Sequence, residues 1–347
     1  MIVILDTSNK PFYNNEIFKF EIASKYPGSL TAYYLHELCK KNDVEIYTAD
    51  YAIENNLEIT NAFIITEILT SWTNELVRRG AKKHILLCME TPSFAWKFYA
   101  KLKYFTSQYK YSFLFSGSKS KVSNLTNFVP TIFPQPDFIA NSKFSNSWEN
   151  RNHLTLINSN QIRRVYKPLH IFYSLFDKSL KSELYTLRLK LIYFFHKSGK
   201  FDLYGRNWDK KIFGIPNKYY KAALSVYKGS VEDKIITMSN YKFALCIENI
   251  VYPGYITEKI FDCLFAGCIP IYYGAPDVED YIPKNCYIDY RDFKSNYELN
   301  NYLENFDSSK FNEFHNNISI FLLSNKFKEY TCKSYADKLF STIKLKE

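Results

Sequence analysis

One continuous stretch, residues 241–283, leaves the chain few ways to fold (YKFALCIENIVYPGYITEKIFDCLFAGCIPIYYGAPDVEDYIP). Residues 242–247 form an apolar run with polar neighbours, which is typical of a strand covered on both faces of a sheet. Thr257 can cap a helix over residues 258–266, and residues 269–273 are a second apolar run. This order predicts a βαβ unit in an α/β domain.

The loops that leave these strands carry polar residues. Glu248 and Asn249 follow the first strand, and Tyr255, Glu258 and Lys259 lie at the start of the helix. Ligands of α/β sheets bind at the carboxyl ends of the strands. Lys259 and the helix N-terminus suit a diphosphate, while Glu258 can face a developing positive charge. The alternative is an ordinary βαβ unit whose Glu-Lys pair is a solvated helix start.

The same stretch resembles the family 10 glycosyltransferases of bacterial type, the α-1,3/4-fucosyltransferases. The resemblance lies in a strand that ends in Glu-Asn, then Tyr-Ile-Thr-Glu-Lys, then Ala-Gly-Cys-Ile-Pro-Ile-Tyr-Tyr-Gly-Ala-Pro. It implies the GT-B architecture, in which two Rossmann-like domains face a central cleft. It also implies an inverting transfer of L-fucose from GDP-L-fucose to a hydroxyl of a glycan acceptor.

Strands alternate with helices in the N-terminal half, which indicates a Rossmann-like sheet. We expect strands at residues 2–5, 44–47, 84–89 and 112–116, and a short strand at 131–133. Helices are expected at 30–41 and at 61–79.

Glu90 follows the strand predicted at 84–89, at the edge of the sheet where sites form. A carboxylate there can take the proton of an attacking sugar hydroxyl. The resemblance supports this role, because family members carry a Glu, often followed by Pro, that serves as the general base. The alternative is a loop acid or a helix cap beside Pro92.

In the C-terminal half, strands are expected at residues 153–157 and 201–204, with a helix at 183–196 between them. The resemblance places a diphosphate-binding arginine on the helix after the first donor-domain strand, and Arg188 has that position. Arg188 can also be a surface arginine on an amphipathic helix, and Arg206 is the second candidate.

The resemblance implies roles for the remaining candidates. Glu258 would stabilise the oxocarbenium-like centre, and Lys259 and Arg188 would hold the diphosphate. Asn249 and Tyr255 would position the nucleotide sugar. The sequence contains no Asp-x-Asp pair and no paired histidine spacing, so no metal ion or other cofactor is expected.

The polar segment 145–152 is the expected boundary between an acceptor-binding domain, residues 1–148, and a GDP-sugar-binding domain, residues 149–325. Residues 326–347 are expected to form a C-terminal helix that crosses back to the first domain, as in two-domain transferases of this shape.

The composition limits the kinds of partner and compartment that we expect for this protein. The 347 residues carry a net charge of +10, which fits an anionic ligand: a nucleotide sugar, a phospholipid surface or nucleic acid. The seven cysteines form no Cys-x-x-Cys pair and predict reduced thiols, and no apolar run is long enough to span a bilayer. We therefore expect a cytoplasmic enzyme, peripheral to the membrane at most, that acts in surface-glycan or lipopolysaccharide synthesis or in protein glycosylation.

Two other functions fit the same residues. One is a related transferase that uses another GDP-sugar. The other is a non-enzymatic, basic nucleotide- or RNA-binding protein, for which residues 210–237 supply lysines and tyrosines. No RNP pattern or zinc-ligand spacing accompanies that segment, so we expect no nucleic-acid partner.

Overall fold

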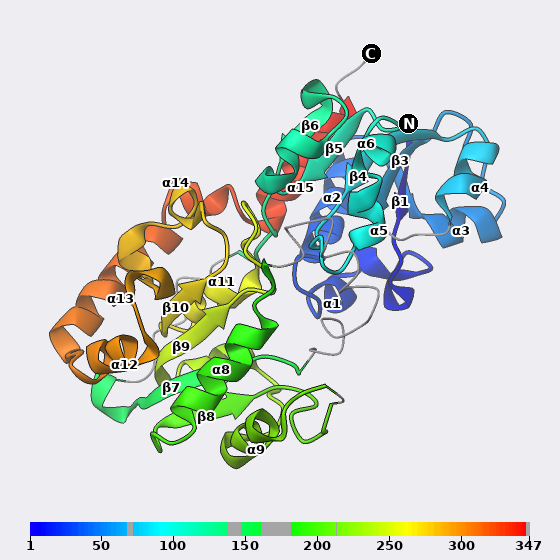
Figure 1. The fold of residues 1–347 in the computed structure, drawn as a ribbon. Helices are drawn as coiled ribbons and strands as arrows, with labels where there is room; N and C mark the ends of the chain where they lie inside the picture. Colours follow the sequence, from blue (N-terminus) through cyan, green and yellow to red (C-terminus); the bar gives the residue numbers. More distant parts are fainter. Residues whose placement is uncertain (68–71, 138–146, 161–181, 213, 345–347) are drawn as a thin grey trace. The chain divides into compact units, whose positions relative to one another are not determined.

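The computed structural model describes residues 1–67, 72–137, 147–160, 182–212 and 214–344. The chain divides into two compact units, drawn in Figure 1. The first unit comprises Met1–Asp137 together with Lys328–Glu347, and the second comprises Phe138–Phe327. Each unit is an α/β domain with a parallel sheet, as the sequence predicts, and each is described here by itself.

The first unit is built on a six-stranded parallel sheet in the order β2-β1-β3-β4-β5-β6. Its strands are β1 (Ile2–Asp6), β2 (Glu45–Thr48), β3 (Phe63–Glu67), β4 (Lys82–Leu87), β5 (Tyr111–Leu114) and β6 (Phe128–Pro130). Its helices are α1 (Phe20–Ala23), α2 (Leu30–Lys41), α3 (Ala49–Glu54), α4 (Thr73–Arg78), α5 (Trp96–Ala100), α6 (Leu102–Thr106) and α15 (Cys332–Lys344).

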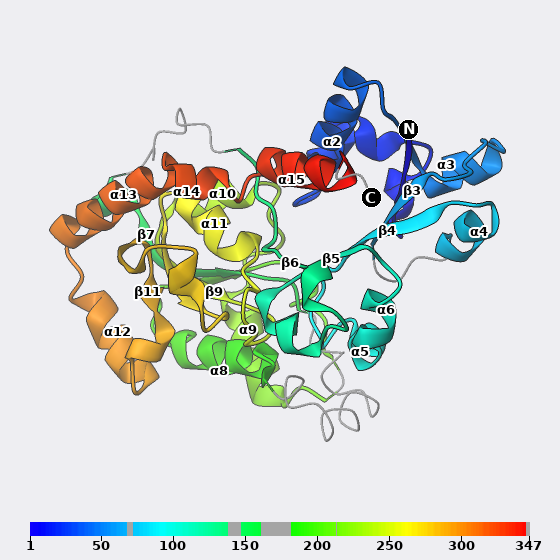
Figure 2. The ribbon, with the colours of Figure 1, turned by 90° about the horizontal axis from the view of Figure 1, so that it is seen from above.

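Helices cover both faces of this sheet, because successive side chains of each strand point to opposite faces. Val3 and Leu5 of β1 pack in one buried cluster with residues of α2 and α15. Ile4 of the same strand packs on the other face with residues of α3 and α4. The C-terminal helix α15 lies beside α2 in both ribbon views (Figures 1 and 2), so the end of the chain completes the core of the first unit.

Two of the predicted elements in this unit are wrong. Residues 61–79 are not one helix: they contain strand β3 and the short helix α4, and residues 68–71 between them lie outside the described residues. The run Phe-Ile-Ile-Thr-Glu of β3 is rich in β-branched residues and pairs with β1 and β4 in the middle of the sheet, which outweighs its helical periodicity. The short strand expected at 131–133 is instead β6, three residues earlier.

The second unit is built on a five-stranded parallel sheet in the order β11-β10-β9-β7-β8. Its strands are β7 (Asn152–Ile157), β8 (Phe201–Tyr204), β9 (Tyr241–Ile247), β10 (Ile269–Tyr273) and β11 (Ile288–Asp289). Its helices are α8 (Tyr185–Phe195), α9 (Asn217–Val226), α10 (Lys234–Met238), α11 (Glu258–Phe265), α12 (Asn296–Glu304) and α13 (Ser308–Leu322), and α14 (Asn325–Lys328) ends at the unit boundary.

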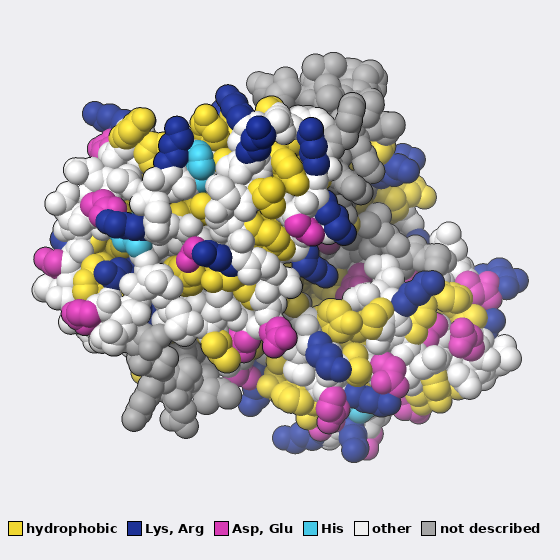
Figure 3. Space-filling view, turned by 90° about the horizontal axis from the view of Figure 1, so that it is seen from below, with side chains coloured by type: hydrophobic (Ala, Val, Ile, Leu, Met, Phe, Trp, Pro, Cys, Tyr) yellow, Lys and Arg dark blue, Asp and Glu magenta, His cyan; other side chains and the backbone are white. Residues whose placement is uncertain are grey.

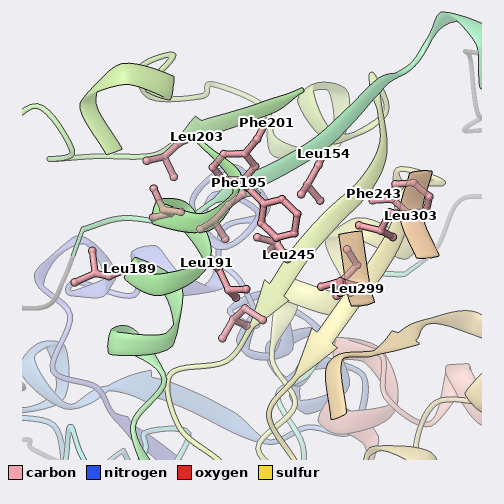
Figure 4. Close-up of a cluster of buried hydrophobic side chains, with 14 of the residues drawn as sticks. Leu154, Leu189, Leu191, Phe195, Phe201, Leu203, Phe243, Leu245, Leu299 and Leu303 are labelled. Carbon is pink, nitrogen blue, oxygen red and sulfur yellow. The ribbon is translucent and has the colours of Figure 1, made fainter. Parts of the chain in front are cut away.

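Helices cover this second sheet on both faces as well. Figure 2 shows α8 and α9 on one side of it and α10 and α11 on the other. Figure 4 shows the apolar cluster under α8, where Leu191 and Phe195 of that helix meet Leu154 and Leu245 of the strands. The cluster fixes α8 against the ends of β7 and β9, which positions the polar residues on the helix.

The strand orders locate the binding edge of each sheet. In the second unit the chain passes from β7 outward to β8 and then returns to β9 on the opposite side of β7. In the first unit the same reversal occurs between β1 and β3. Such a reversal opens a crevice at the carboxyl ends of the two strands, where α/β sheets bind ligands.

Candidate active site

Arg188 lies at the strand reversal of the second unit. Its guanidinium donates two hydrogen bonds to the carbonyl of Ile247 at the end of β9, at 3.1 and 2.6 Å. It also donates to the carboxamide oxygens of Asn158 after β7, at 3.1 Å, and Asn249 after β9, at 2.9 Å. Arg188 therefore joins the ends of the two strands that flank the crevice.

Arg188 is buried, with 2% of its surface exposed. Burial lowers the pKa of its guanidinium, with the ring of Tyr185 and the carboxylate of Glu248 acting in the opposite direction. The guanidinium still carries its charge, since arginine does not lose its proton in proteins. A buried cation committed to four hydrogen bonds orients Asn158 and Asn249 and supplies a positive field at the crevice. The alternative prediction, that Arg188 is a surface arginine on an amphipathic helix, is therefore wrong.

Asn249 and Tyr255 are in contact, as expected for residues that share a ligand. The Asn249 amide donates to the Tyr255 hydroxyl at 3.2 Å, while its carbonyl oxygen accepts from Arg188. Both of its polar atoms are thus oriented by neighbours. The Tyr255 side chain is buried, with 4% of its surface exposed.

The carboxylate of Glu248 is fully buried one residue beyond β9. It accepts hydrogen bonds from the backbone N–H and the hydroxyl of Thr257, each at 2.9 Å, and from the ammonium of Lys259 at 3.0 Å. Thr257 is the N-cap of α11. Glu248 therefore ties the end of β9 to the first turn of the helix, and a buried carboxylate needs such partners because desolvation is costly.

Lys259 lies between two carboxylates at the N-terminus of α11. Its ammonium is 3.0 Å from Glu248 and 3.8 Å from Glu258, and its side chain is 15% exposed. Burial opposes the charge, but Glu248 and Glu258 outweigh it and raise the pKa of Lys259 above its ordinary value. Lys259 is therefore a stable cation beside the backbone N–H groups of a helix start, an arrangement that binds phosphate.

Glu258 is the first residue of α11, with 23% of its side chain exposed. Burial disfavours its charge, but Lys259 and then Lys234 reverse this effect, so the pKa of Glu258 is lowered. It remains ionised at neutral pH and can stabilise positive charge that develops beside it.

Gly274 and Gly205 allow the backbone to come close to these groups. A Cβ atom on Gly274, just after β10, would lie 2.4 Å from Cγ of Glu248. A Cβ atom on Gly205, just after β8, would lie 2.1 Å from the carbonyl oxygen of Asn158, and the φ of Gly205 is +124°. Both positions require glycine for the strand ends to pack as they do.

Glu90 belongs to the first unit and lies three residues beyond β4, which ends at Leu87 rather than at the predicted Met89. It is partly exposed, and its carbonyl oxygen accepts a hydrogen bond from the Tyr99 hydroxyl at 3.0 Å. This contact fixes the backbone of the loop at the carboxyl edge of the sheet. The structure therefore gathers five of the six predicted residues in the second unit and places Glu90 in the other one.

Three residues that organise the cluster were not among the predicted site residues: Asn158, Glu248 and Thr257, of which Thr257 was predicted only as the helix cap that it is. Glu248 had the clearest signal, since an acid that ends a buried strand must find a cation or several donors. Among the described residues, no group of three or more His, Cys, Asp or Glu side chains is arranged to hold a metal ion.

In the comparisons with known proteins, the matched part of the chain includes this cluster. Residues 179–336 match the family model of glycosyltransferase family 10 (fucosyltransferase), C-terminal part. This match covers just under half of the chain, so the matched residues are similar to the C-terminal part of that family. The matched stretch contains Arg188, Asn249, Tyr255, Glu258 and Lys259, and the match supports the family predicted from the sequence.

Curated relatives match over a shorter stretch. An α-(1,4)-fucosyltransferase of Arabidopsis thaliana is 42% identical over 80 residues, which is 22% of this chain and 20% of the relative. The α-(1,3)-fucosyltransferase FucT of Helicobacter pylori is 43% identical over 76 residues, 22% of this chain and 16% of the relative. The chain thus matches only about a fifth of the length of these relatives. These matches support the predicted glycosyltransferase class.

Solved structures resemble the whole chain in fold. Anabaena HepE, in complex with UDP and glucose, has a TM-score of 0.55 at 9% identity, with 99% of both chains covered. An α1,3-fucosyltransferase with GDP has a TM-score of 0.50 at 15% identity, with 99% of this chain and 89% of that chain covered. At these identities the likeness concerns the fold alone, and it confirms the predicted GT-B class.

Proposed function

We propose that this protein is an inverting fucosyltransferase of the α-1,3/4, bacterial type, which transfers L-fucose from GDP-L-fucose to a hydroxyl of a glycan acceptor. The observation that carries the proposal is the Glu258–Lys259 pair on the first turn of α11, inside the region that matches family 10. A stable cation and a helix N-terminus suit the diphosphate of the donor, and an ionised carboxylate beside them suits the sugar.

Each of these residues has its own role in the reaction. The acceptor oxygen attacks the anomeric carbon of fucose while the bond from that carbon to the diphosphate oxygen breaks and leaves its electron pair on GDP. Lys259 and the α11 N-terminus stabilise the negative charge on GDP, and Glu258 stabilises the positive charge on the sugar ring. Glu90 takes the proton of the acceptor hydroxyl. Arg188 orients Asn249 and adds positive charge behind the diphosphate site. No metal ion or other cofactor has a part in these steps.

We infer that the acceptor is a surface glycan with glucose- or N-acetylglucosamine-type residues, such as a polysaccharide or lipopolysaccharide, met on the cytoplasmic side by peripheral association with the membrane. All seven cysteines are free and buried, which suits a reducing compartment. The described residues form no helix that is long and apolar enough to cross a membrane.

A nucleic-acid function is the weaker candidate. On the face shown in Figure 3, Lys and Arg side chains are spread among acidic, apolar and neutral ones and form no continuous basic stripe. Groove-binding surfaces gather their basic residues along a backbone path. The positive net charge alone does not favour RNA over a nucleotide sugar.

A thermal-shift screen with GDP, UDP, CMP and single-stranded RNA separates these functions, since a ligand that binds only the folded state raises Tm. We expect a shift with GDP, and a shift with UDP or RNA alone would contradict the proposal. Turnover of GDP-fucose against GDP-mannose, with a panel of N-acetylglucosamine- and galactose-containing acceptors, then identifies the donor sugar. Turnover of GDP-mannose alone would assign the protein to a related GDP-sugar transferase.

A further inference from the structure

The first unit contains a cavity of about 160 Å³ that the residues above do not use. It lies at the carboxyl ends of β1, β3 and β4, beneath the N-terminal half of α2 and beside α15, and Leu5, Glu67 and Met89 line it from the strand side. This is the strand reversal of the first sheet, where binding is expected. A cavity of about 150 Å³ can hold one six-membered ring.

The cavity walls are mainly apolar, with a few hydrogen-bonding groups. Leu35 and Phe133 contribute to the apolar part, and Glu67 is the acidic residue of the lining. The hydroxyls of two further lining residues, Thr31 and Tyr335, are buried and interact with Cys332 and Thr131. The acidic group that a ligand would meet in the cavity is therefore Glu67.

The Glu67 carboxyl is held in place at the strand reversal. The hydroxyl of Thr7, the first residue after β1, donates to its Oε2 atom at 2.7 Å. Burial raises the pKa of Glu67, Asp6 raises it further, and the hydrogen bond from Thr7 opposes the change. A carboxyl with a raised pKa keeps its proton over a wider pH range and can then donate to, as well as accept from, a hydroxyl.

The described residues that line the cavity include neither Lys nor Arg. A phosphate or carboxylate ligand would meet no cation there and would face the Glu67 carboxyl. A purely apolar ligand would leave the polar groups of the wall without partners, which costs free energy. A neutral ring with hydroxyl groups satisfies both parts of the wall, because a pyranose has an apolar C–H face and a polar edge.

We propose that this cavity binds one neutral sugar ring of the acceptor, with the Glu67 carboxyl hydrogen-bonded to a ring hydroxyl and the apolar wall against its C–H face. That the ring belongs to the acceptor rests on the proposed function. Met89 lines the cavity and Glu90 is the next residue, so a ring held here is next to the strand end that carries the general base of that function. Glu67 is in this view a residue that binds the acceptor and takes no proton from it.

Methionine methyl groups report binding directly. The chain has three methionines, and of these Met89 lines the cavity whereas Met238 is buried in the second unit beside Cys263. The full chain, labelled with ¹³C at its methionine methyl groups, is titrated with the methyl β-glycosides of glucose, galactose and N-acetylglucosamine. We expect at least one of them to shift the Met89 signal saturably while Met238 stays in place.

Separate titrations with inorganic phosphate and with cyclohexanol serve as comparisons. A Met89 shift with phosphate or cyclohexanol and with none of the sugars would overturn the proposal, as would no shift with any ligand. Since the titration needs no turnover, a chain that binds the sugar but does not cleave GDP-fucose would contradict the fucosyltransferase function and leave this site standing.

Two substitutions test the polar wall. Glu67→Gln should weaken sugar binding about tenfold, the lower end for a hydrogen bond with an ionisable group, while GDP still raises Tm. The matched control is Glu54→Gln, an exposed carboxylate on α3 of the same unit, which should bind the sugar as the wild type does. If Glu67→Gln does not fold, Glu67→Asp keeps the carboxyl, withdraws it by one methylene group and should weaken binding several-fold. Wild-type sugar affinity in the folded variants would overturn the assignment.

Discussion

Lys259 has two functions that a single substitution removes together. It neutralises Glu248, which is fully buried, and it presents a positive charge at the start of α11. Removal of one partner from a buried ion pair costs about 3–5 kcal/mol of stability, because the other charge stays buried without compensation. An effect of Lys259 on ligand binding must therefore be measured on protein that is shown to be folded.

We expect Lys259→Ala to weaken GDP binding about tenfold to a hundredfold, since a charge-assisted contact contributes roughly 1.5–3 kcal/mol. The double variant Glu248→Gln/Lys259→Ala restores neutrality in the buried site and should regain part of the lost stability without regaining GDP affinity. Calorimetric titration with GDP measures this. Lys200→Ala, which removes a lysine just before β8 whose ammonium is 2.7 Å from Glu304, is the control. Wild-type GDP affinity in Lys259→Ala would place this residue outside the donor site.

The two predicted catalytic carboxylates, Glu258 and Glu90, lie in different units. Substitution of each should therefore have a different effect on the kinetics. Glu258→Gln should slow both transfer and acceptor-free hydrolysis of GDP-fucose, because its partner is the charge on the sugar that leaves GDP. Glu90→Gln should lower the transfer kcat by about 10²–10⁴, the usual contribution of a general base, and leave GDP affinity unchanged. Both variants must melt at the wild-type temperature. Wild-type transfer by folded Glu90→Gln would show that another residue is the base.

For single residues, the sequence predicted the positions of the cluster residues in their elements better than the contacts between them. The positions of Glu258 and Lys259 follow from a local signal, the cap Thr257 and the helix after it, and α11 begins where predicted. The burial of Arg188 and the Glu248–Lys259 pair depend on how α8 and α11 pack against the strand ends. Such contacts join residues 11 to 61 positions apart, and no local pattern encodes them.

At the scale of elements, the loop after β10 depends on the absence of a side chain at Gly274. Gly274→Ala would place a Cβ atom 2.4 Å from Glu248 and 2.6 Å from the hydroxyl of Tyr272. We expect a loss of about 1–3 kcal/mol of stability from overpacking, with weaker GDP binding because Glu248 must move. Thermal unfolding and GDP titration measure the two effects. In Gly199→Ala the new Cβ atom meets no atom within 4 Å at a φ of +68°, so only the backbone cost should appear and GDP binding should be normal.

The end of α11 is held by a histidine that is sensitive to acid. The ring of His315 on α13 and the guanidinium of Arg151 both contact the carbonyl oxygen of Gly267. Burial and then the charge of Arg151 lower the pKa of His315 to about 4, although the hydrogen bond with Gly267 opposes this change. The unfolded chain takes up this proton near pH 6.5 and the folded chain only near pH 4. Stability should therefore fall as the pH drops through this range, by roughly 3 kcal/mol at most.

Urea unfolding between pH 4 and 7.5 measures this dependence. His315→Gln keeps a donor for the carbonyl and removes the ionisable ring, so its stability should change less over the same range. An equal slope in wild type and variant would assign the acid sensitivity to other groups.

The elements also show where sequence patterns are ambiguous. Strands β8 and β10 and helix α2 lie where they are expected because their apolar runs end at glycine or polar residues. The run of β3 has a different context: its five residues precede the amphipathic helix α4, so the combined pattern has helical periodicity. Only pairing with β1 and β4 identifies residues 63–67 as a strand.

On the scale of the whole molecule, two parallel sheets reverse their strand order in the same way, and each has polar groups at the reversal. The second unit gathers Arg188 and Lys259, whereas the first has the Glu67 carboxyl and an apolar wall without Lys or Arg among its described residues. The difference in charge favours the proposed division, with the anionic donor in the second unit and a neutral acceptor in the first. The sequence predicted this division only through the family resemblance, because net charge is a property of the whole chain.

The proposed division, with the donor in the second unit and the acceptor in the first, predicts a pattern of hydrogen–deuterium exchange in the full chain. Saturating GDP should slow exchange at residues 247–259, where the end of β9 and the start of α11 meet the diphosphate, and around Asn158. Exchange at residues 63–67 and 85–90 of the first unit should not change. The methyl glycoside that shifts Met89 should give the opposite pattern, because its hydrogen bonds are with the first sheet. UDP is the control nucleotide and should protect residues 247–259 less than GDP at equal concentration. Protection by GDP at residues 63–67 and 85–90 without protection at 247–259 would reverse the assignment of the two units, and with it the roles of Glu90 and Lys259.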